Sequence, residues 1–117
     1  MRLLIALLPC LLLSGCPVVT CTTEARVSVQ VTITDQAGNI VDGATVTYDS
    51  DDGTGLPCDE GSAGTWACGY EVDGEITVHA EAPFLLPASD TVTVDSDECH
   101  VISESLTLVL EEEMAPG

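Results

Sequence analysis

Basic residues are nearly absent from this sequence, which has no lysine and only two arginines, Arg2 and Arg26, against 20 acidic residues. Without lysine, it cannot form the phosphate-binding loop in which a lysine reaches the phosphates. A chain with a formal charge of −18 also has almost no groups that could neutralise a phosphate backbone. These absences argue against nucleic acid as a partner and leave cations and basic proteins open, although solubility alone would explain the acidity.

Catalytic signatures are missing as well. No Gly-x-Ser-x-Gly elbow occurs, because Gly61-Ser62-Ala63-Gly64 has the wrong spacing. Among 20 acids, chance pairs of carboxylates are expected, so they indicate no glycosidase. His79 and His100 lack the spacing of metal ligands and are predicted to be ordinary strand and turn residues. The sequence therefore predicts a protein that is not an enzyme and has no cofactor.

A signal peptide is predicted over residues 1–15. Arg2 precedes an apolar run over residues 3–13, which is shorter than the roughly 20 residues of a membrane-spanning helix. The residues that follow, Leu13-Ser14-Gly15-Cys16, resemble the lipobox of bacterial lipoproteins. This resemblance implies cleavage before Cys16, transfer of a diacylglyceryl group to its sulfur, and acylation of the new amino group.

The lipobox resemblance also implies a location. Stable anchoring needs at least two acyl chains, and a diacylglyceryl Cys16 has them. Pro17 stands where inner-membrane lipoproteins of enteric bacteria carry Asp, which favours the outer membrane or its periplasmic face. The membrane is thus a predicted partner through Cys16, and residues 16–24 are predicted to form the lipidated anchor and a short tether.

The remaining chain shows the two-residue period of β-strands and no sustained helical period. Strands are predicted at residues 26–34, 44–48, 65–70, 75–80, 90–94 and 103–110. The first two are expected to form a hairpin-like unit around the turn residues 35–39, and the acidic, glycine-rich residues 49–64 a surface loop. Six or seven short strands indicate an all-β fold, an antiparallel β-sandwich over residues 25–110 followed by an acidic flexible tail at 111–117.

Residues 29–46 follow the order Val-x-Val-x-Ile-x-Asp-x-x-Gly-x-x-Val-x-Gly-Ala-x-Val, which resembles the opening of carboxypeptidase-regulatory-like domains. Residues 74–80 and 90–94 are similar to the closing strands of that family. The resemblance implies a transthyretin-like Greek-key sandwich used as an accessory module, with no catalytic residues to carry over. The chain departs from the family in its acidic loop, in its cysteines and at Ala82-Pro83-Phe84, where a Pro-Gly-aromatic turn is common.

Six cysteines are present, of which Cys10 leaves with the signal and Cys16 takes the lipid. The four that remain are Cys21, Cys58, Cys68 and Cys99. Four cysteines in an exported chain predict two disulfides, with three possible connectivities. Because Cys58 and Cys68 flank a turn-rich stretch, we favour a bridge between them and a second between Cys21 and Cys99. The closely spaced cysteine pairs of a zinc ribbon are missing.

The acidic run Asp49-Ser50-Asp51-Asp52-Gly53 is the best candidate for a metal site, since clustered carboxylates supply the oxygen ligands that calcium prefers. It does not match an EF-hand loop, because Gly53 comes one position early. Asp49, Asp51 and Asp52 are therefore weak calcium candidates, and a solvated turn is the alternative. Trp66 could stack on a sugar, but its position beside Cys68 favours core packing against a disulfide.

These features predict a membrane-anchored lipoprotein of the cell envelope that acts as a non-enzymatic structural or protein-interaction module. A calcium- or carbohydrate-binding surface lipoprotein is the alternative. If Cys21 is tied into the domain, it lies only five positions after Cys16, a reach of under about 20 Å. The domain is then expected to lie close to the membrane with its acidic face turned outward, toward a basic or cation-bridged envelope protein.

Overall fold

A computed structural model describes residues 21–113 of the chain. The predicted signal peptide, the lipidation site Cys16, the first part of the tether and residues 114–117 of the predicted tail lie outside the described residues. Eight strands and no helix make up the described part, which confirms the predicted all-β class. Consequently this part of the chain has no helix able to cross a membrane.

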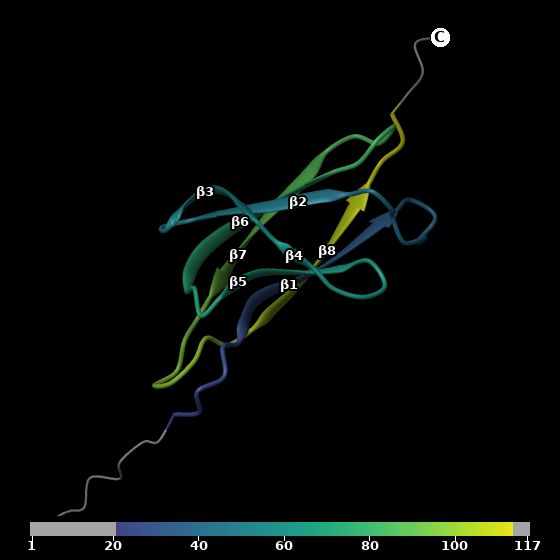
Figure 1. Ribbon diagram of the computed structural model, residues 1–117. Helices are drawn as coiled ribbons and strands as arrows, with labels where there is room; N and C mark the ends of the chain where they lie inside the picture. Colours follow the sequence, from purple (N-terminus) through teal and green to yellow (C-terminus); the bar gives the residue numbers. More distant parts are fainter. Residues whose placement is uncertain (1–20, 114–117) are drawn as a thin grey trace, which may run out of the picture.

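The strands form two four-stranded sheets that pack face to face as a β-sandwich (Figure 1). In chain order they are β1 (Val27–Asp35), β2 (Thr45–Ser50), β3 (Gly53–Pro57), β4 (Asp59–Glu60), β5 (Thr65–Tyr70), β6 (Gly74–Glu81), β7 (Ala88–Val94) and β8 (Glu104–Leu110). The first sheet has the order β4-β5-β1-β8 and the second the order β3-β2-β6-β7. All pairs are antiparallel except β1 with β8, which run parallel.

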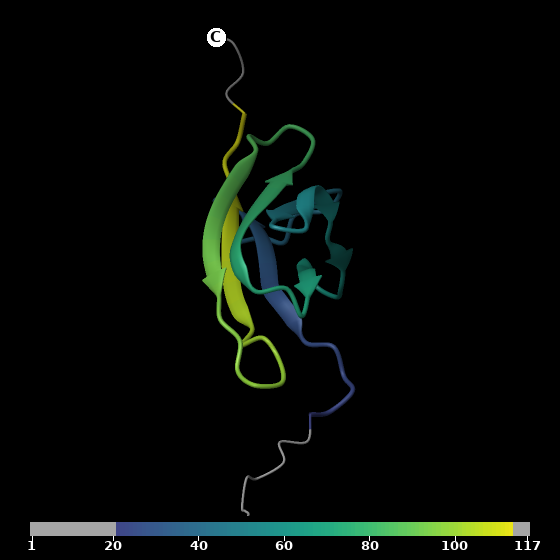
Figure 2. The same cartoon turned by 90° about the vertical axis from the view of Figure 1, so that its left-hand side faces the viewer.

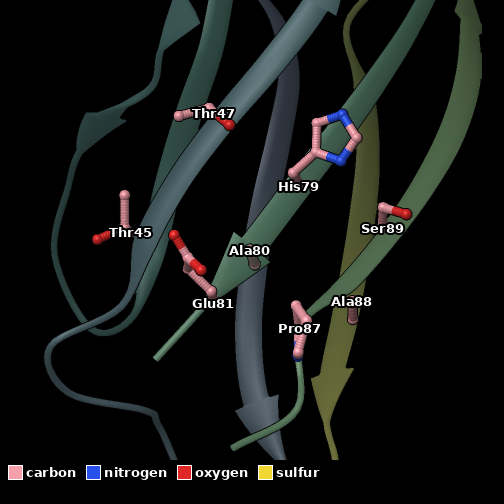
Figure 3. Close-up of a pocket in the computed structure, with 8 residues that line it drawn as sticks. All are labelled: Thr45, Thr47, His79, Ala80, Glu81, Pro87, Ala88 and Ser89. Atoms are coloured by element: carbon pink, nitrogen blue, oxygen red, sulfur yellow. The ribbon is translucent and has the colours of Figure 1, made fainter. Parts of the chain in front are cut away.

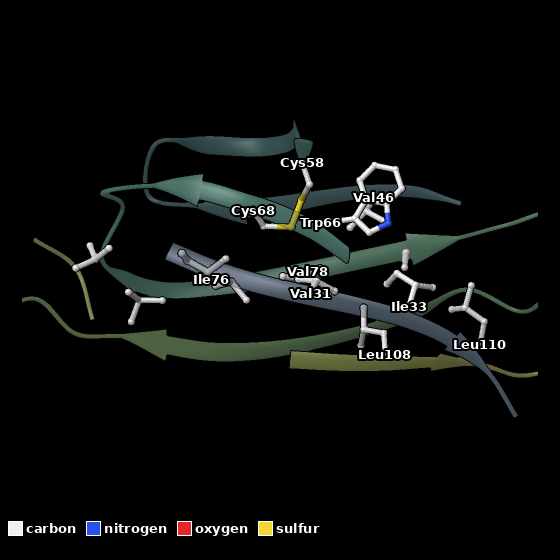
Figure 4. Close-up of a cluster of buried hydrophobic side chains, with 14 residues drawn as sticks. Val31, Ile33, Val46, Cys58, Trp66, Cys68, Ile76, Val78, Leu108 and Leu110 are labelled. Carbon is white, nitrogen blue, oxygen red and sulfur yellow. A yellow bond between two sulfur atoms is a disulfide. The ribbon is translucent and has the colours of Figure 1, made fainter. Parts of the chain in front are cut away.

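The core lies between the sheets and is built mainly from alternate residues of β1, β5, β6 and β8 (Figure 4). On β1, Val29, Val31 and Ile33 are fully buried, as the period of two predicts. On β6, Ile76 and Val78 are buried in the same way from the opposite sheet. Burying these branched side chains removes apolar surface from water on both inner faces, which is what holds the two sheets together.

The expected hairpin between the first two predicted strands is wrong, since β1 and β2 lie in different sheets. The turn after β1 closes on itself: the Asp35 carboxylate accepts hydrogen bonds from the amides of Ala37 and Asn39, both at 2.9 Å. An isolated bridge between Thr34 and Ile40 completes this turn. The chain then continues into the second sheet, and β5 and β8 pair with β1 instead.

The acidic stretch at residues 49–64, predicted as a loop, contains the edge strands β3 and β4. It is too poor in apolar residues to show the alternation of a buried strand, but an edge strand needs only backbone pairing on one side. β3 ends the second sheet and β4 ends the first. The stretch therefore passes from one sheet to the other, which is why the sandwich has more strands than the six or seven predicted.

Because β1 and β8 pair in parallel, both strands run from one end of the sandwich to the other (Figures 1 and 2). Both strands start at the end that we call the anchor pole, formed by residues 21–26, 71–73 and 95–103. Both finish at the opposite end, the distal pole, formed by residues 36–44, 82–87 and 111–113. The described chain accordingly enters the sandwich at one pole and leaves it at the other.

Candidate functional site

Both predicted disulfides are present. Cys58 and Cys68 are joined with their Cα atoms 4.5 Å apart, and Cys21 and Cys99 with theirs 5.2 Å apart. The first bridge is buried in the core, where it fixes the edge stretch to β5. The second lies at the anchor pole and fixes the start of the described chain to the connection between β7 and β8.

Glu71 and His100 form the centre of the anchor pole. The Glu71 carboxylate accepts hydrogen bonds from the amides of Arg26 at 2.9 Å and Val101 at 3.0 Å, and it contacts Nδ1 of His100. Nε2 of His100 lies 2.8 Å from the hydroxyl oxygen of Thr22. Since His100 is only 8% exposed, these contacts link the segment before β1 to two loops through a buried imidazole.

Two carboxylates of this pole, those of Glu71 and Asp97, have a lowered pKa, which favours their charged forms. The amide of Arg26, and then His100 and the amide of Val101, lower the pKa of Glu71 against an opposing effect of burial. The amides of His100 and Cys99, both donating at 2.8 Å to one oxygen of Asp97, lower the pKa of that group. Hydrogen bonds to an ionised carboxylate favour the ionised form, so the network is strongest when both acids are charged.

The order carboxylate, imidazole, hydroxyl is also that of hydrolase triads. In this protein the hydroxyl belongs to Thr22, which lies 2.8 Å from His100 Nε2 and also donates to Oε1 of Glu24 at 3.1 Å. The three residues come from the segment before β1 and from two loops. Their contacts therefore act as a clamp on the chain before β1.

A hollow of about 300 Å³ lies on the outer face of the second sheet, between β2, β6 and β7 (Figure 3). Its polar lining consists of Thr45, Thr47, His79, Glu81 and Ser89. These side chains offer hydroxyl, imidazole and carboxylate groups, but none of the lining residues is Phe, Tyr or Trp. The hollow thus lacks the stacking surface on which a sugar ring usually packs.

The calcium candidates do not converge on one point. Asp49 accepts a hydrogen bond from the amide of Gly55 at 2.8 Å, and its other oxygen lies 2.8 Å from Nε2 of His79. The Gly55 amide and then His79 lower the pKa of Asp49. Asp51 and Asp52 lie beyond it in the β2–β3 turn, and residues 21–113 contain no group of three or more potential metal ligands.

Trp66 packs in the core, as predicted, together with the Cys58–Cys68 bridge (Figure 4). Only 9% of it is exposed. An indole buried between the sheets cannot stack on an external sugar, so Trp66 does not serve as a sugar-binding surface.

The distal pole presents apolar side chains to solvent. The connection between β6 and β7 reads Ala82-Pro83-Phe84-Leu85-Leu86-Pro87, and we call it the apolar tip. Phe84 is 85% exposed, the highest value among the exposed large apolar residues, and Leu86 is 41% exposed. Leu85 between them packs against the core instead. An aromatic ring held this far into solvent is unusual enough to mark a candidate contact site.

Phe84 also has a backbone conformation that large side chains rarely adopt, with φ of +67°. Such a left-handed conformation costs about 1–2 kcal/mol in a residue other than glycine, so the surroundings must impose it. The carbonyl of Phe84 accepts from the amide of Glu113 at 3.2 Å, and the amide of Leu86 donates to the carbonyl of Glu111 at 2.8 Å. Residues that keep such strain concentrate at functional sites.

Acidic residues surround the apolar tip. Glu81 precedes it at the end of β6, and Glu111, Glu112 and Glu113 run beside it, with Leu85 bridged to Glu112. Glu111 and Glu113 of the predicted tail are thus hydrogen-bonded to the tip through their backbone groups.

The sequence led us to expect an acidic face turned outward, but acidic residues lie at both poles. Glu24, Glu71, Asp73 and Asp97 lie at the anchor pole. Both ends of the sandwich are negative, and the distal pole combines this charge with an exposed apolar tip.

Two of these features were missed by reasoning from sequence. His100 was predicted to be an ordinary turn residue, but it bridges Glu71 and Thr22 through contacts far apart in the chain. The apolar tip does have a sequence signal, since six apolar residues between two strands are atypical of a solvent-exposed connection. That signal gives composition only, and does not reveal that Phe84 points outward while Leu85 points inward.

Comparisons with known proteins add no relative. No protein-family model matches the chain, and no curated protein matches it. The resemblances to the lipobox and to carboxypeptidase-regulatory-like domains therefore stay predictions.

Proposed function

We propose that this protein is a lipoprotein of the cell envelope, anchored to a membrane through Cys16, at the outer membrane or its periplasmic face. Its β-sandwich acts as a non-enzymatic structural or protein-interaction module. The lipid holds one end of the sandwich near the membrane, and the other end is free to meet a partner.

The observation that carries the proposal is the opposition of the two poles. The Cys21–Cys99 bridge and the Glu71–His100 network fix the chain entering the sandwich, and the apolar tip lies at the other end. Cys21 is five positions after Cys16, a reach of under about 20 Å. A lipid on Cys16 would therefore keep the anchor pole close to the membrane and direct the distal pole away from it.

Two further features favour an exported protein. Disulfides persist in oxidising compartments, such as the bacterial periplasm, and are rare in the cytosol. The two bridges in this small domain agree with export. The charge of −18 favours solubility on the aqueous side and disfavours contact of the domain itself with anionic lipid.

Metabolic labelling with an alkyne fatty acid tests the anchor directly. We expect the natural chain to carry the label and to enter the detergent-rich phase in detergent phase separation. Cys16→Ser should lose both properties, and Cys10→Ser, which changes the other cysteine of the amino-terminal segment, should keep them. Label retained by Cys16→Ser, or absent from the natural chain, would refute the proposed anchor.

A further inference from the structure

We propose that the apolar tip is the docking site of this module and that its partner is a protein with an apolar pocket bordered by lysine or arginine. Phe84 is the side chain that enters the pocket, and Leu86 covers its edge. This inference rests on the proposed function and names the partner chemistry that the distal pole fits.

Two of the three large apolar side chains of the tip are exposed. Phe84 and Leu86 are exposed, and Leu85 between them is turned into the core, which fixes the direction in which the other two point. Pro83 and Pro87 bracket the segment and restrict its backbone. Phe84 is thus held in a set orientation before any partner arrives, which lowers the entropy lost on binding.

Charge decides which kind of surface can cover the tip. Glu81, Glu111, Glu112 and Glu113 form an acidic border beside Phe84. This border opposes insertion into an anionic lipid surface and opposes pairing with the same tip of a second copy, because like charges would face each other. A protein pocket with a cationic rim buries the Phe84 ring and pairs with the carboxylates around it.

The border also predicts how binding occurs. Charges at the rim of an interface mainly raise the association rate and make it depend on salt, whereas a buried aromatic residue sets the dissociation rate. Phe84 and the glutamates should therefore affect binding in separable ways.

A photoreactive phenylalanine analogue placed at residue 84 of the full chain, in intact cells, is the first test. The control is the same analogue at Ile102, which is 51% exposed but lies at the anchor pole. We expect a protein adduct from position 84 only. No adduct, equal adducts from both positions, an adduct between two copies of this chain, or one with lipid alone would overturn the proposal.

Affinity for the purified partner is the second test. Phe84→Ser should weaken binding about 30-fold, the effect of a strong interface residue, while Ile102→Ser should leave it unchanged. Phe84→Asn, which tolerates a left-handed backbone, should weaken binding equally and shows that misfolding is not the cause. Unchanged affinity in both Phe84 variants would overturn the inference.

Salt separates the role of the border from that of the ring. With Glu111, Glu112 and Glu113 all changed to Gln, we expect slower association and a weaker dependence of its rate on salt. A rate unaffected by salt in the natural chain would rule out the cationic rim. The affinity and salt measurements need no membrane, so they test the docking site separately from the anchor. A negative result in them leaves the fatty-acid labelling of Cys16 unaffected, and the reverse also holds.

Discussion

The two poles of the sandwich differ in how their residues are fixed. At the anchor pole, a disulfide and a chain of hydrogen bonds through Glu71 and His100 join the entering chain to two loops. At the distal pole, backbone hydrogen bonds hold Phe84 in a strained conformation with its ring in solvent. Side-chain contacts fix the chain at the anchor pole, whereas backbone hydrogen bonds at the distal pole hold one side chain in solvent.

This contrast separates stability from recognition. Polar groups at the anchor pole find their partners within the molecule, so changes to them should alter unfolding. The exposed ring at the distal pole contributes little packing, so its removal should spare or improve stability and affect only what the protein binds. Variants at each pole test this separation.

Loss of the anchor-pole disulfide should have the largest effect. Cys21 and Cys99 are 78 residues apart and Cys58 and Cys68 are 10 apart. In a chain-entropy treatment, replacing the first pair by Ala costs up to about 4.5 kcal/mol of unfolding free energy and replacing the second about 2.8 kcal/mol. Urea unfolding of both double variants measures the difference. The reverse order would show that the packing of the buried Cys58–Cys68 bridge outweighs the entropy of the longer loop.

At the distal pole, Phe84→Gly should raise the free energy of unfolding by about 0.5–1 kcal/mol. Glycine adopts positive φ without steric cost, and this gain exceeds the entropy it loses on folding. Phe84→Ala keeps the strained backbone and is the control, with little expected change. Thermal unfolding of the two variants checks this, and a destabilised Phe84→Gly would mean that the ring packs in solution.

The effect of Glu71→Gln should depend on pH. Its pKa lies below the ordinary value of 4.5 in the folded protein, so the stabilisation is fully present above about pH 4.5 and is lost as pH falls through the lowered pKa. The difference in melting temperature between the natural chain and the variant should shrink below that pH. Glu75→Gln, at an exposed position of β6, is the control, and a gap that is constant with pH would contradict the prediction.

Calcium should have the smallest effect. A ligand that binds only the folded state raises stability by RT ln(1 + [L]/Kd), and Asp49 is already paired with His79 and Gly55. Millimolar calcium should leave the melting temperature unchanged, with magnesium as the control. A rise specific to calcium would restore the calcium-binding alternative.

Several elements of the fold were predictable because their signals are local. The alternation in β1, β6 and β8 reflects one buried and one exposed face, which a sequence records directly. Three disulfide connectivities were possible, and the pairing present is the one favoured because Cys58 and Cys68 flank a turn-rich stretch. The hairpin between β1 and β2 was wrong because a turn signal marks a change of direction and does not record which sheet receives the next strand.

The β-sandwich class and the excess of negative charge can be read from the sequence, since each depends on composition or on short-range spacing, whereas the cysteine pairing was one of three possibilities. The three-dimensional arrangement shows that β1 and β8 run parallel, that His100 meets Glu71 and Thr22, and that Phe84 projects from the pole opposite Cys21. These features depend on contacts between residues distant in the chain. Such contacts leave no periodic trace in the sequence, because they arise only when the two sheets pack.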